Sequence, residues 1–150
     1  MTLLKKGDAA PDFVGMDQND NEIKLKDFKG KKVILYFYPK DSTPGCTAQA
    51  CNLRDNYDFF LKSGFVVLGI SADNQKSHQK FIEKYNLPFP LIADTEKKII
   101  KAYGVWGPKK FMGKIFDGIH RTTFLIDENG AIEEIIEKVD TKEHTKQILK

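Results

Sequence analysis

The two cysteines of this 150-residue chain lie five positions apart, at Cys46 and Cys51, shortly after the apolar run 33–38. Pro39 follows that run, and the residues up to Cys46 are typical of a short loop that begins a helix. Backbone amides and the positive end of the helix dipole stabilise negative charge there, which favours the thiolate form of a cysteine. Cys46 is therefore a candidate nucleophile or redox thiol. The alternative is that Cys46 is a small buried apolar side chain.

Helical periodicity places the two sulfurs on different sides of an expected helix over residues 46–62. Cys51 falls on its polar side, whereas Cys46 belongs to an apolar stripe that continues through Ala50, Leu53, Tyr57, Phe60 and Leu61. In an ideal helix, Cα atoms five residues apart are about 8.6 Å from each other. A disulfide joins Cα atoms that are about 4.4–6.8 Å apart. A bond between these sulfurs therefore requires the first turns of the helix to unwind.

The start of this helix has a clear signal. Thr43 is able to cap it, Pro44 suits the first helical position, and Cys46 is then the third helical residue. The Thr43 hydroxyl could instead point into a site around the sulfur. One hydroxyl cannot serve fully as a cap acceptor and as a substrate ligand, so the sequence leaves both roles open.

Two other chemistries compete for the cysteine pair. A zinc site would use the C-x4-C spacing and some of the three histidines, but no second ligand pair completes four ligands. A disulfide reductase or isomerase usually carries C-x-x-C at the helix start, so the longer spacing disfavours it. Metal content of the purified protein tests the first alternative, and an assay of disulfide reduction tests the second.

The remaining pattern predicts the elements that must position the sulfurs. Buried strands are expected at 32–38 and 65–70, short strands at 11–14, 22–25 and 91–92, and helices at 75–85, 95–103 and 141–149. A hairpin of residues 121–126 and 131–137 is expected around Asn129-Gly130. This order predicts an α/β fold with a central mixed sheet and helices on both faces, similar to a thioredoxin-like core. We expect residues 1–150 to form a single domain.

Several other residues receive structural interpretations. The glycine-punctuated stretch 104–118 is expected to be an ordered loop in which Trp106 and Phe111 pack. His78 and His144 are expected on solvated helix faces.

Two residues near the expected site are also read as structural. His120 is interpreted as a structural or pocket-edge residue rather than a base. Arg54 could support Arg121, but pairing with Asp55 or Asp58 is the favoured interpretation.

Composition narrows the class of protein. The chain is 41% hydrophobic and 30% charged, and its net charge of +3 is spread along the sequence. This disfavours a nucleic-acid or membrane-binding patch. The N-terminal residues lack the pattern of a signal peptide, and no run approaches the ~20 apolar residues of a membrane span. We therefore expect a reducing cytoplasm, where a cysteine pair is more often catalytic or metal-binding than a structural disulfide.

Three stretches resemble the peroxiredoxins, which are thiol-dependent peroxidases on a thioredoxin-like fold. Pro39, Thr43 and Cys46 form the signature P-x-x-x-T-x-x-C, and the wider segment 38–55 is similar to the bacterioferritin comigratory protein (peroxiredoxin Q) branch. Residues 104–114 and 118–127 are similar to the same branch. The resemblance covers essentially the whole chain in the same order.

The resemblance implies a role for each of five residues. Cys46 would be the peroxidatic cysteine, Thr43 and nearby backbone amides would hold the peroxide, and Pro39 would shield the site. Arg121 would complete the pocket. Cys51 would be the resolving cysteine, as in atypical 2-Cys members that form the bond within one chain. A binding domain without activity would have no reason to combine Thr43, Cys46 and Arg121.

The resemblance also implies substrates and partners. Hydrogen peroxide and small organic hydroperoxides would oxidise Cys46 to a sulfenic acid, which condenses with the second thiol to a disulfide. Thioredoxin or a similar dithiol would then reduce that disulfide by exchange. No metal or organic cofactor is required. Because the cysteine pair lies within one chain, we expect a monomer.

Overall fold

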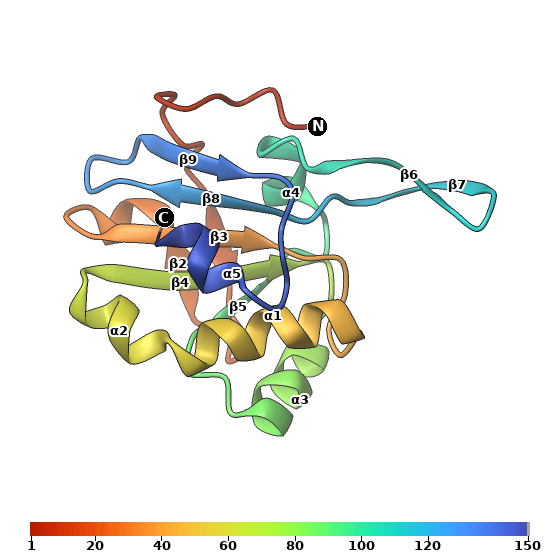
Figure 1. Cartoon of the computed structure of the whole chain (residues 1–150), viewed down its shortest axis with the longest axis horizontal. Helices are drawn as coiled ribbons and strands as arrows, with labels where there is room; N and C mark the ends of the chain where they lie inside the picture. The colour runs from red at the N-terminus through yellow and green to blue at the C-terminus, as the bar shows by residue number, and fades with distance from the viewer. Residues whose placement is uncertain (150) are drawn as a thin grey trace.

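A computed structural model describes residues 1–149 of the chain, and its centre is a five-stranded mixed sheet (Figure 1). The central strand, β3, pairs in parallel with β4 and antiparallel with β8. One edge is completed by a parallel pairing of β4 with β5, and the other by an antiparallel pairing of β8 with β9. In sheet order the strands are β5 (Leu91–Ala93), β4 (Phe65–Ser71), β3 (Lys32–Phe37), β8 (Thr122–Ile126) and β9 (Ile132–Ile136).

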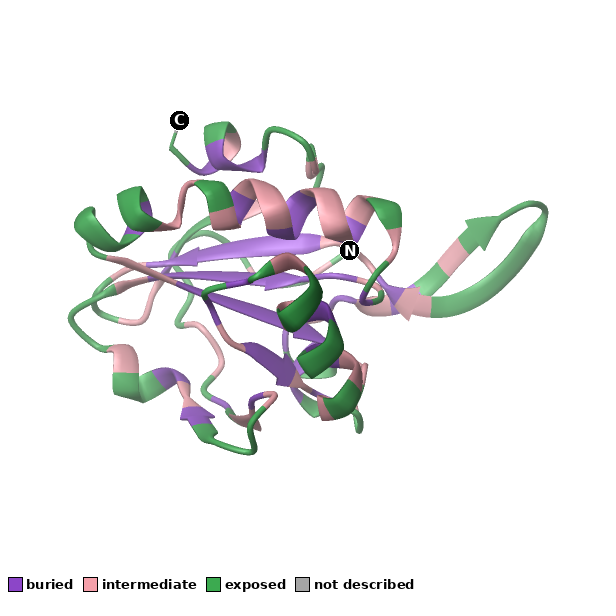
Figure 2. Cartoon of the chain, turned by 90° about the horizontal axis from the view of Figure 1, so that it is seen from below, coloured by how far each residue is buried: buried purple, intermediate pink, exposed green. Residues whose placement is uncertain are grey.

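Helices cover both faces of this sheet, as predicted (Figures 1 and 2). One face is covered by α1 (Pro44–Asp55), α2 (Tyr57–Lys62), α3 (Gln75–Tyr85) and α5 (His144–Ile148). The other face is covered by α4 (Lys98–Ala102) and by the N-terminal β1 (Val14–Met16), β2 (Glu22–Lys24) and 3-10 helix η1 (Leu25–Phe28). The predicted fold class is therefore confirmed.

The central strand β3 explains why two separate cores form. Its side chains alternate between the two faces of the sheet. Val33, Leu35 and Phe37 pack in the core that contains α4, and Ile34 and Tyr36 pack in the core that contains α1. All five are at most 1% exposed. A strand that is buried on both faces reads as a continuous apolar run, which is why the sequence identifies it.

The predicted helix over 46–62 is wrong as one element, because it is divided at Asn56. The Asn56 backbone has φ −112° and ψ 12°, and its Nδ2 donates to the Asn52 carbonyl at 2.8 Å. The break changes the direction of the following turns. Phe60 is fully buried, but Leu61 is 46% exposed and does not continue the apolar stripe of α1.

The predicted loop over 104–118 is also wrong. Strands β6 (Trp106–Phe111) and β7 (Lys114–Ile119) form a hairpin that projects from the body of the molecule (Figure 1). Met112 and Gly113 join the strands with φ of 51° and 78°, as a tight hairpin turn requires. Trp106 packs partly against the core as expected, whereas Phe111 is 66% exposed because it lies near the projecting end.

Two other helices are shorter than predicted. Helix α4 begins only at Lys98, because Lys97 has a left-handed backbone with φ 62°. Helix α5 contains only five residues. The predictions for α3 and for the β8–β9 hairpin are confirmed. Among residues 1–149, no helix has the length and apolarity needed to cross a membrane.

Candidate active site

Helix α1 begins directly beside the end of β3 and brings Cys46 into the first turn. Thr43 is the N-cap residue, Pro44 is the first helical residue and Cys46 is the third, as the sequence predicts. The Thr43 hydroxyl makes no capping bond. It donates instead to the Lys40 carbonyl at 2.8 Å. The sequence left two roles open for Thr43, and the structure excludes a side-chain cap.

The sheet register brings Arg121 to the sulfur. Because β3 and β8 are antiparallel with Phe37 opposite Thr122, the start of β8 lies beside the end of β3. Arg121 immediately precedes β8, and its Nη2 donates to Cys46 Sγ at 3.3 Å. The Cys46 side chain is buried, at 1% exposure. A guanidinium at this distance stabilises a thiolate, because it always carries its charge.

Two further residues of α1 make this approach possible. Gln49 is fully buried, and its Oε1 accepts a 2.7 Å hydrogen bond from Arg121 Nη1. A Cβ atom on Gly45 would lie 3.2 Å from Arg121 Nη2, so the absence of a side chain there leaves room for the guanidinium. Sequence reasoning missed Gln49. Its position three residues after Cys46, on the same face of the helix, was the available signal.

Two polar atoms near the sulfur have no hydrogen-bond partner in the part of the chain that the structure describes. They are Gln49 Nε2 and the hydroxyl of Tyr36, both buried. Burial raises the pKa of Tyr36 well above its usual range, and the negative charge of Cys46 adds to this effect. The Tyr36 phenol therefore stays protonated in the core.

The structure does not bring all five predicted residues together. Both cysteines are free thiols in the same helix, with Cys46 buried and Cys51 half-buried. Cys51 makes no hydrogen bond with the group around Cys46 within residues 1–149. Pro39 is half-buried just beyond β3, at the first position of the loop that leads to Thr43.

A second polar cluster is centred on Asp41, within this loop. The Asp41 carboxylate is buried and accepts from the Tyr38 hydroxyl at 2.5 Å and from Ser77 Oγ at 2.8 Å. It also contacts His78 Nδ1 at 2.7 Å, while the Asp41 amide donates to Asp73 Oδ2 at 2.8 Å. The cluster therefore ties the loop to α3 and to the end of β4.

The prediction of solvated histidines is wrong for both His78 and His144, which are fully buried. His78 Nε2 faces the Ile92 carbonyl at 3.0 Å, and a carbonyl only accepts, so this nitrogen carries a hydrogen. His144 lies between Thr123 Oγ1 and Gln147 Oε1, each at 2.8 Å. Burial lowers the pKa of His144. Both side chains face inward, where His78 contacts Asp41 and the Ile92 carbonyl and His144 contacts Thr123 of β8.

Asp41, Asp73 and His78 also lie close enough to suggest a metal site. Their bonds argue against one, because the oxygen atoms that would ligate a metal already receive hydrogens from protein groups. Within residues 1–149, no group of three or more metal-ligating side chains includes either cysteine. The zinc alternative therefore lacks a ligand set.

Other polar predictions can be compared directly with the structure. Arg54 pairs with Asp55 at 2.9 Å, as expected. His120 Nε2 lies 3.0 Å from the Pro108 carbonyl, at the edge of the site.

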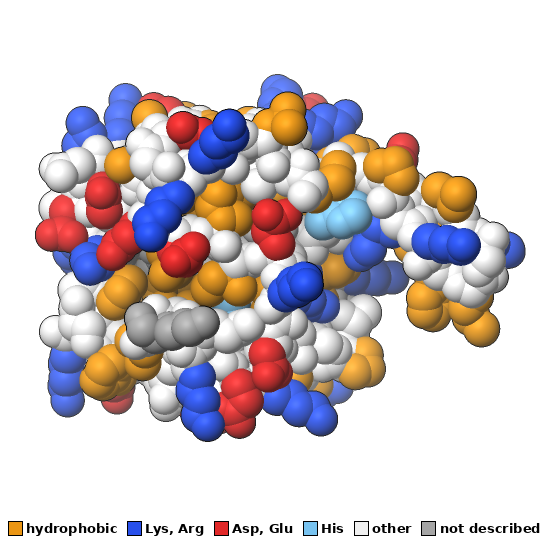
Figure 3. Space-filling model, turned by 45° about the horizontal axis from the view of Figure 1, so that its top comes forward, with side chains coloured by type: hydrophobic (Ala, Val, Ile, Leu, Met, Phe, Trp, Pro, Cys, Tyr) orange, Lys and Arg blue, Asp and Glu red, His pale blue; other side chains and the backbone are white. Residues whose placement is uncertain are grey.

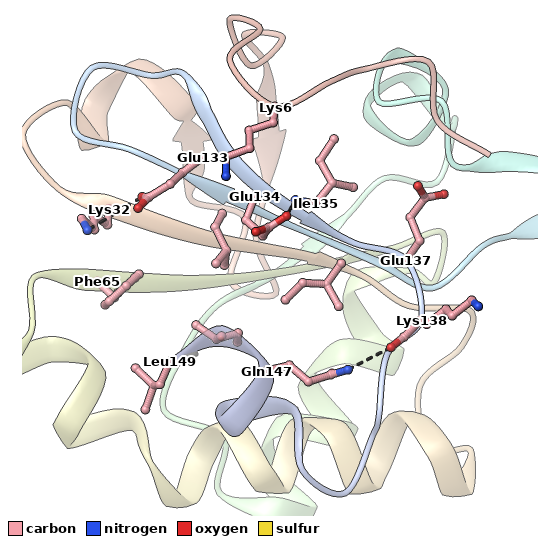
Figure 4. A pocket seen from close by; sticks show the side chains of 13 residues that line it. Lys6, Lys32, Phe65, Glu133, Glu134, Ile135, Glu137, Lys138, Gln147 and Leu149 are labelled. Carbon is pink, nitrogen blue, oxygen red and sulfur yellow. Dashed lines mark hydrogen bonds and ion pairs between the residues drawn. The ribbon is translucent and has the colours of Figure 1, made fainter.

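A large hollow of the surface lies away from the sulfur. It has a volume of about 800 Å³ and lies between β9 and α5, lined by residues such as Lys32, Glu133 and Gln147 (Figure 4). None of the five predicted site residues lines it. The site around Cys46 is therefore identified by its charges and contacts rather than by cavity size.

Comparison with known proteins gives consistent results. Residues 6–135 match the model of the AhpC/TSA family. The chain is 48% identical over 149 residues to Peroxiredoxin Bcp of Escherichia coli (strain K12), covering 99% of this chain and 96% of that protein. It is 46% identical over 146 residues to Peroxiredoxin Bcp of Bacillus subtilis (strain 168), covering 97% and 93%.

Solved structures show the same relationship. Peroxiredoxin Q of Xanthomonas campestris superposes with a TM-score of 0.88 at 33% identity, covering 99% of this chain and 94% of that one. A cysteine-to-serine variant of Xylella fastidiosa PrxQ superposes with a TM-score of 0.91 at 31% identity, covering 99% and 95%.

Proposed function

Because this chain belongs to the AhpC/TSA family and is a thiol-dependent peroxidase of the Bcp and peroxiredoxin Q type, we propose that Cys46 is the thiol that reacts with peroxide. Cys51 then resolves the product within the same chain. The observation that carries this proposal is the 3.3 Å contact between Arg121 Nη2 and Cys46 Sγ at the start of α1. The helix end and the guanidinium both favour a thiolate at this position.

Thr43 and Pro39 complete the proposed peroxide site. The Thr43 hydroxyl donates its hydrogen to the Lys40 carbonyl, so its oxygen lone pairs remain able to accept from the O–H of a peroxide. Pro39 has no N–H and cannot compete for that peroxide. Arg121 donates to the two oxygens as charge moves between them, which lowers the barrier because the donor is already fixed in place by Gln49.

The reaction balances without a cofactor. The Cys46 thiolate attacks the terminal oxygen of ROOH, the O–O bond breaks, and RO⁻ leaves and takes a proton to become ROH. Cys46 is now a sulfenic acid, and the Cys51 thiol condenses with it to give a disulfide and water. An external dithiol reduces the disulfide by exchange and is itself oxidised.

Disulfide formation requires α1 to open. Both sulfurs lie in one helix, where ideal geometry separates their Cα atoms by about 8.6 Å, beyond the usual reach of about 6.8 Å. Cys46 must also leave its buried position. We therefore propose that residues 43–55 unwind after the first reaction with peroxide.

Substrate, reductant and setting follow from the family. We propose hydrogen peroxide and small organic hydroperoxides as substrates, because a Xanthomonas campestris bacterioferritin comigratory protein of similar fold is described for its alkyl peroxide reduction activity. Thioredoxin is the proposed reductant. We further propose that residues 1–150 act as one domain, as a monomer, in the cytoplasm.

The test is peroxide consumption coupled to thioredoxin, thioredoxin reductase and NADPH. Cys46→Ser should lose turnover completely. Cys51→Ser should react once with peroxide, fail to turn over, and hold a sulfenic acid that dimedone labels. Turnover by Cys46→Ser at the wild-type rate would exclude Cys46 as the reacting thiol.

A further inference from the structure

A separate hollow of about 400 Å³ opens beside Arg121, at the foot of the β6–β7 hairpin. Four stretches of chain build it: Met1, Lys109 from β6, residues 120–122 at the start of β8, and residues 137–139 after β9. Basic side chains gather around this foot of the hairpin in the space-filling view (Figure 3). Sequence reasoning could not find the hollow, because it treated the hairpin as a loop.

Most of the charged side chains that line this hollow are cationic. Lys109, Arg121 and Lys138 contribute three positive charges. The one carboxylate in the lining, Glu137, is already paired with the N-terminal ammonium of Met1 at 2.8 Å. No ion pair of Lys138 occurs within residues 1–149. The hollow therefore has an excess of positive charge that no carboxylate of residues 1–149 neutralises.

The positive charge is held in place by contacts with the backbone. Lys109 Nζ donates to the Ile119 carbonyl at 2.9 Å, which fixes its position. Partial burial lowers the pKa of Lys109, and the charge of Arg121 lowers it further. This effect is the result of placing cations near each other, and an anion bound between them would relieve it.

Arg121 belongs to this hollow and to the thiol site at once. Its Nη2 contacts Cys46 Sγ, and the same side chain lines the hollow. Arg121 therefore links the sulfur to the hollow, whereas Cys46 itself does not line it.

We propose that this hollow binds the carboxylate of a hydroperoxide substrate while the O–O group lies at Cys46, so the enzyme prefers hydroperoxides that carry a negative charge. The inference rests on the proposed function and adds a substrate class to it. The carboxylate takes no part in the bond changes, which remain attack on the terminal oxygen and release of RO⁻. Its effect is to hold the reacting group in position.

The experiment compares two hydroperoxides that differ by one carboxylate, cumene hydroperoxide and its 4-carboxy derivative. The rate of Cys46 oxidation is measured in single turnover, without reductant, so that reductant binding has no influence. The quantity of interest is the rate constant for the carboxylated compound divided by that for the neutral one.

Wild type should favour the carboxylated compound at low salt, and the preference should shrink at about 0.5 M salt because of screening. Lys138→Glu should lower the ratio by about ten-fold. Glu137→Gln should raise it by about two-fold, since it removes the one negative charge of the lining. Sulfate should compete only against the carboxylated compound.

The control is Lys142→Glu, which makes the same change in net charge at an exposed lysine outside the lining. This variant should keep the wild-type ratio. An unchanged ratio in Lys138→Glu overturns the proposal, and so does an equal loss in the control, since that would reflect net charge alone. If wild type consumes neither cumene hydroperoxide nor hydrogen peroxide, the proposed function itself is wrong.

Discussion

One polar cluster is centred on Asp41 within the loop 39–43 and another on Cys46 just after it, and they differ in how completely their hydrogen bonds are satisfied. We define the Asp41 cluster as Tyr38, Asp41, Asp73, Ser77 and His78. Its central carboxylate receives contacts from three side chains, and its histidine is bonded at both nitrogens. We define the thiol cluster as Cys46, Gln49 and Arg121. Gln49 Nε2 and the nearby Tyr36 hydroxyl lack partners among the described residues.

The difference indicates which part of the loop can move. A fully satisfied polar cluster holds its elements rigidly, whereas unpartnered buried groups raise the free energy of the folded state. The chain is thus fixed at Asp41 in the loop and less strongly held five residues later, at Cys46 in α1. The proposed unwinding is therefore expected to begin after Asp41 and to leave the Asp41 cluster intact.

The Asp41 cluster should dominate stability. Asp41→Ala leaves His78 and two hydroxyls buried without their acceptor, so we expect a loss of about 3–5 kcal/mol in the free energy of unfolding. Urea denaturation measures it. The matched control is Asp55→Ala, which breaks the exposed pair with Arg54 and should cost at most about 1 kcal/mol. Equal losses in the two variants would contradict the assigned difference between buried and exposed pairs.

The thiol cluster should instead have the larger effect on the rate at which Cys46 reacts with peroxide. Arg121→Ala should slow the reaction of Cys46 with peroxide by about 100- to 1,000-fold, because it removes a fixed donor to the developing charge. Its effect on unfolding should be smaller than that of Asp41→Ala. Stopped-flow oxidation gives the rate, with Arg54→Ala as the control arginine. Wild-type reactivity in Arg121→Ala would remove this residue from the site.

Oxidation to the disulfide should speed amide hydrogen exchange around the thiol cluster and leave exchange around the Asp41 cluster unchanged. In the disulfide form, amides of residues 43–55 should exchange at least about ten-fold faster than in the reduced form. Residues 142–145 should also lose protection, because Asn52 bonds the Lys142 carbonyl and the Thr145 amide. Residues 73–78 should keep theirs.

Cys51→Ser treated with peroxide is the control for this measurement, since it cannot form the disulfide. Equal protection in both redox states, with the Cys46–Cys51 bond confirmed by mass spectrometry, would falsify the unwinding mechanism.

The smallest expected effect is a pH dependence at His144. Burial lowers the pKa of His144 in the folded state, while an unfolded histidine titrates at about 6.5. Below that pH the unfolded chain takes up a proton that the folded state does not, so stability falls until the folded pKa is reached. Urea denaturation of wild type and His144→Gln between pH 7 and 5 should show a steeper loss in wild type. Parallel profiles would contradict this.

The two buried histidines show where sequence reasoning reached its limit. Each lies in a short amphipathic segment among polar neighbours, so composition suggests solvent exposure. Their burial depends on contacts with distant elements, such as those of His78 with Asp41 and of His144 with Thr123. Gln49 was missed for a related reason, because its partner Arg121 is 72 residues away in sequence.

The sequence by itself determined those elements that a short run of neighbouring residues specifies. A run that is apolar on both faces specified β3, the Thr43-Pro44 pair specified the start of α1, and helical periodicity separated the buried Cys46 from the half-buried Cys51. Only the tertiary structure decided what surrounds the sulfur. The antiparallel register of β3 and β8 brings Arg121 to Cys46, and the β6–β7 hairpin forms the cationic hollow beside it. Pairing register and side-chain contacts between distant segments depend on the packing of the whole chain, which no local pattern encodes.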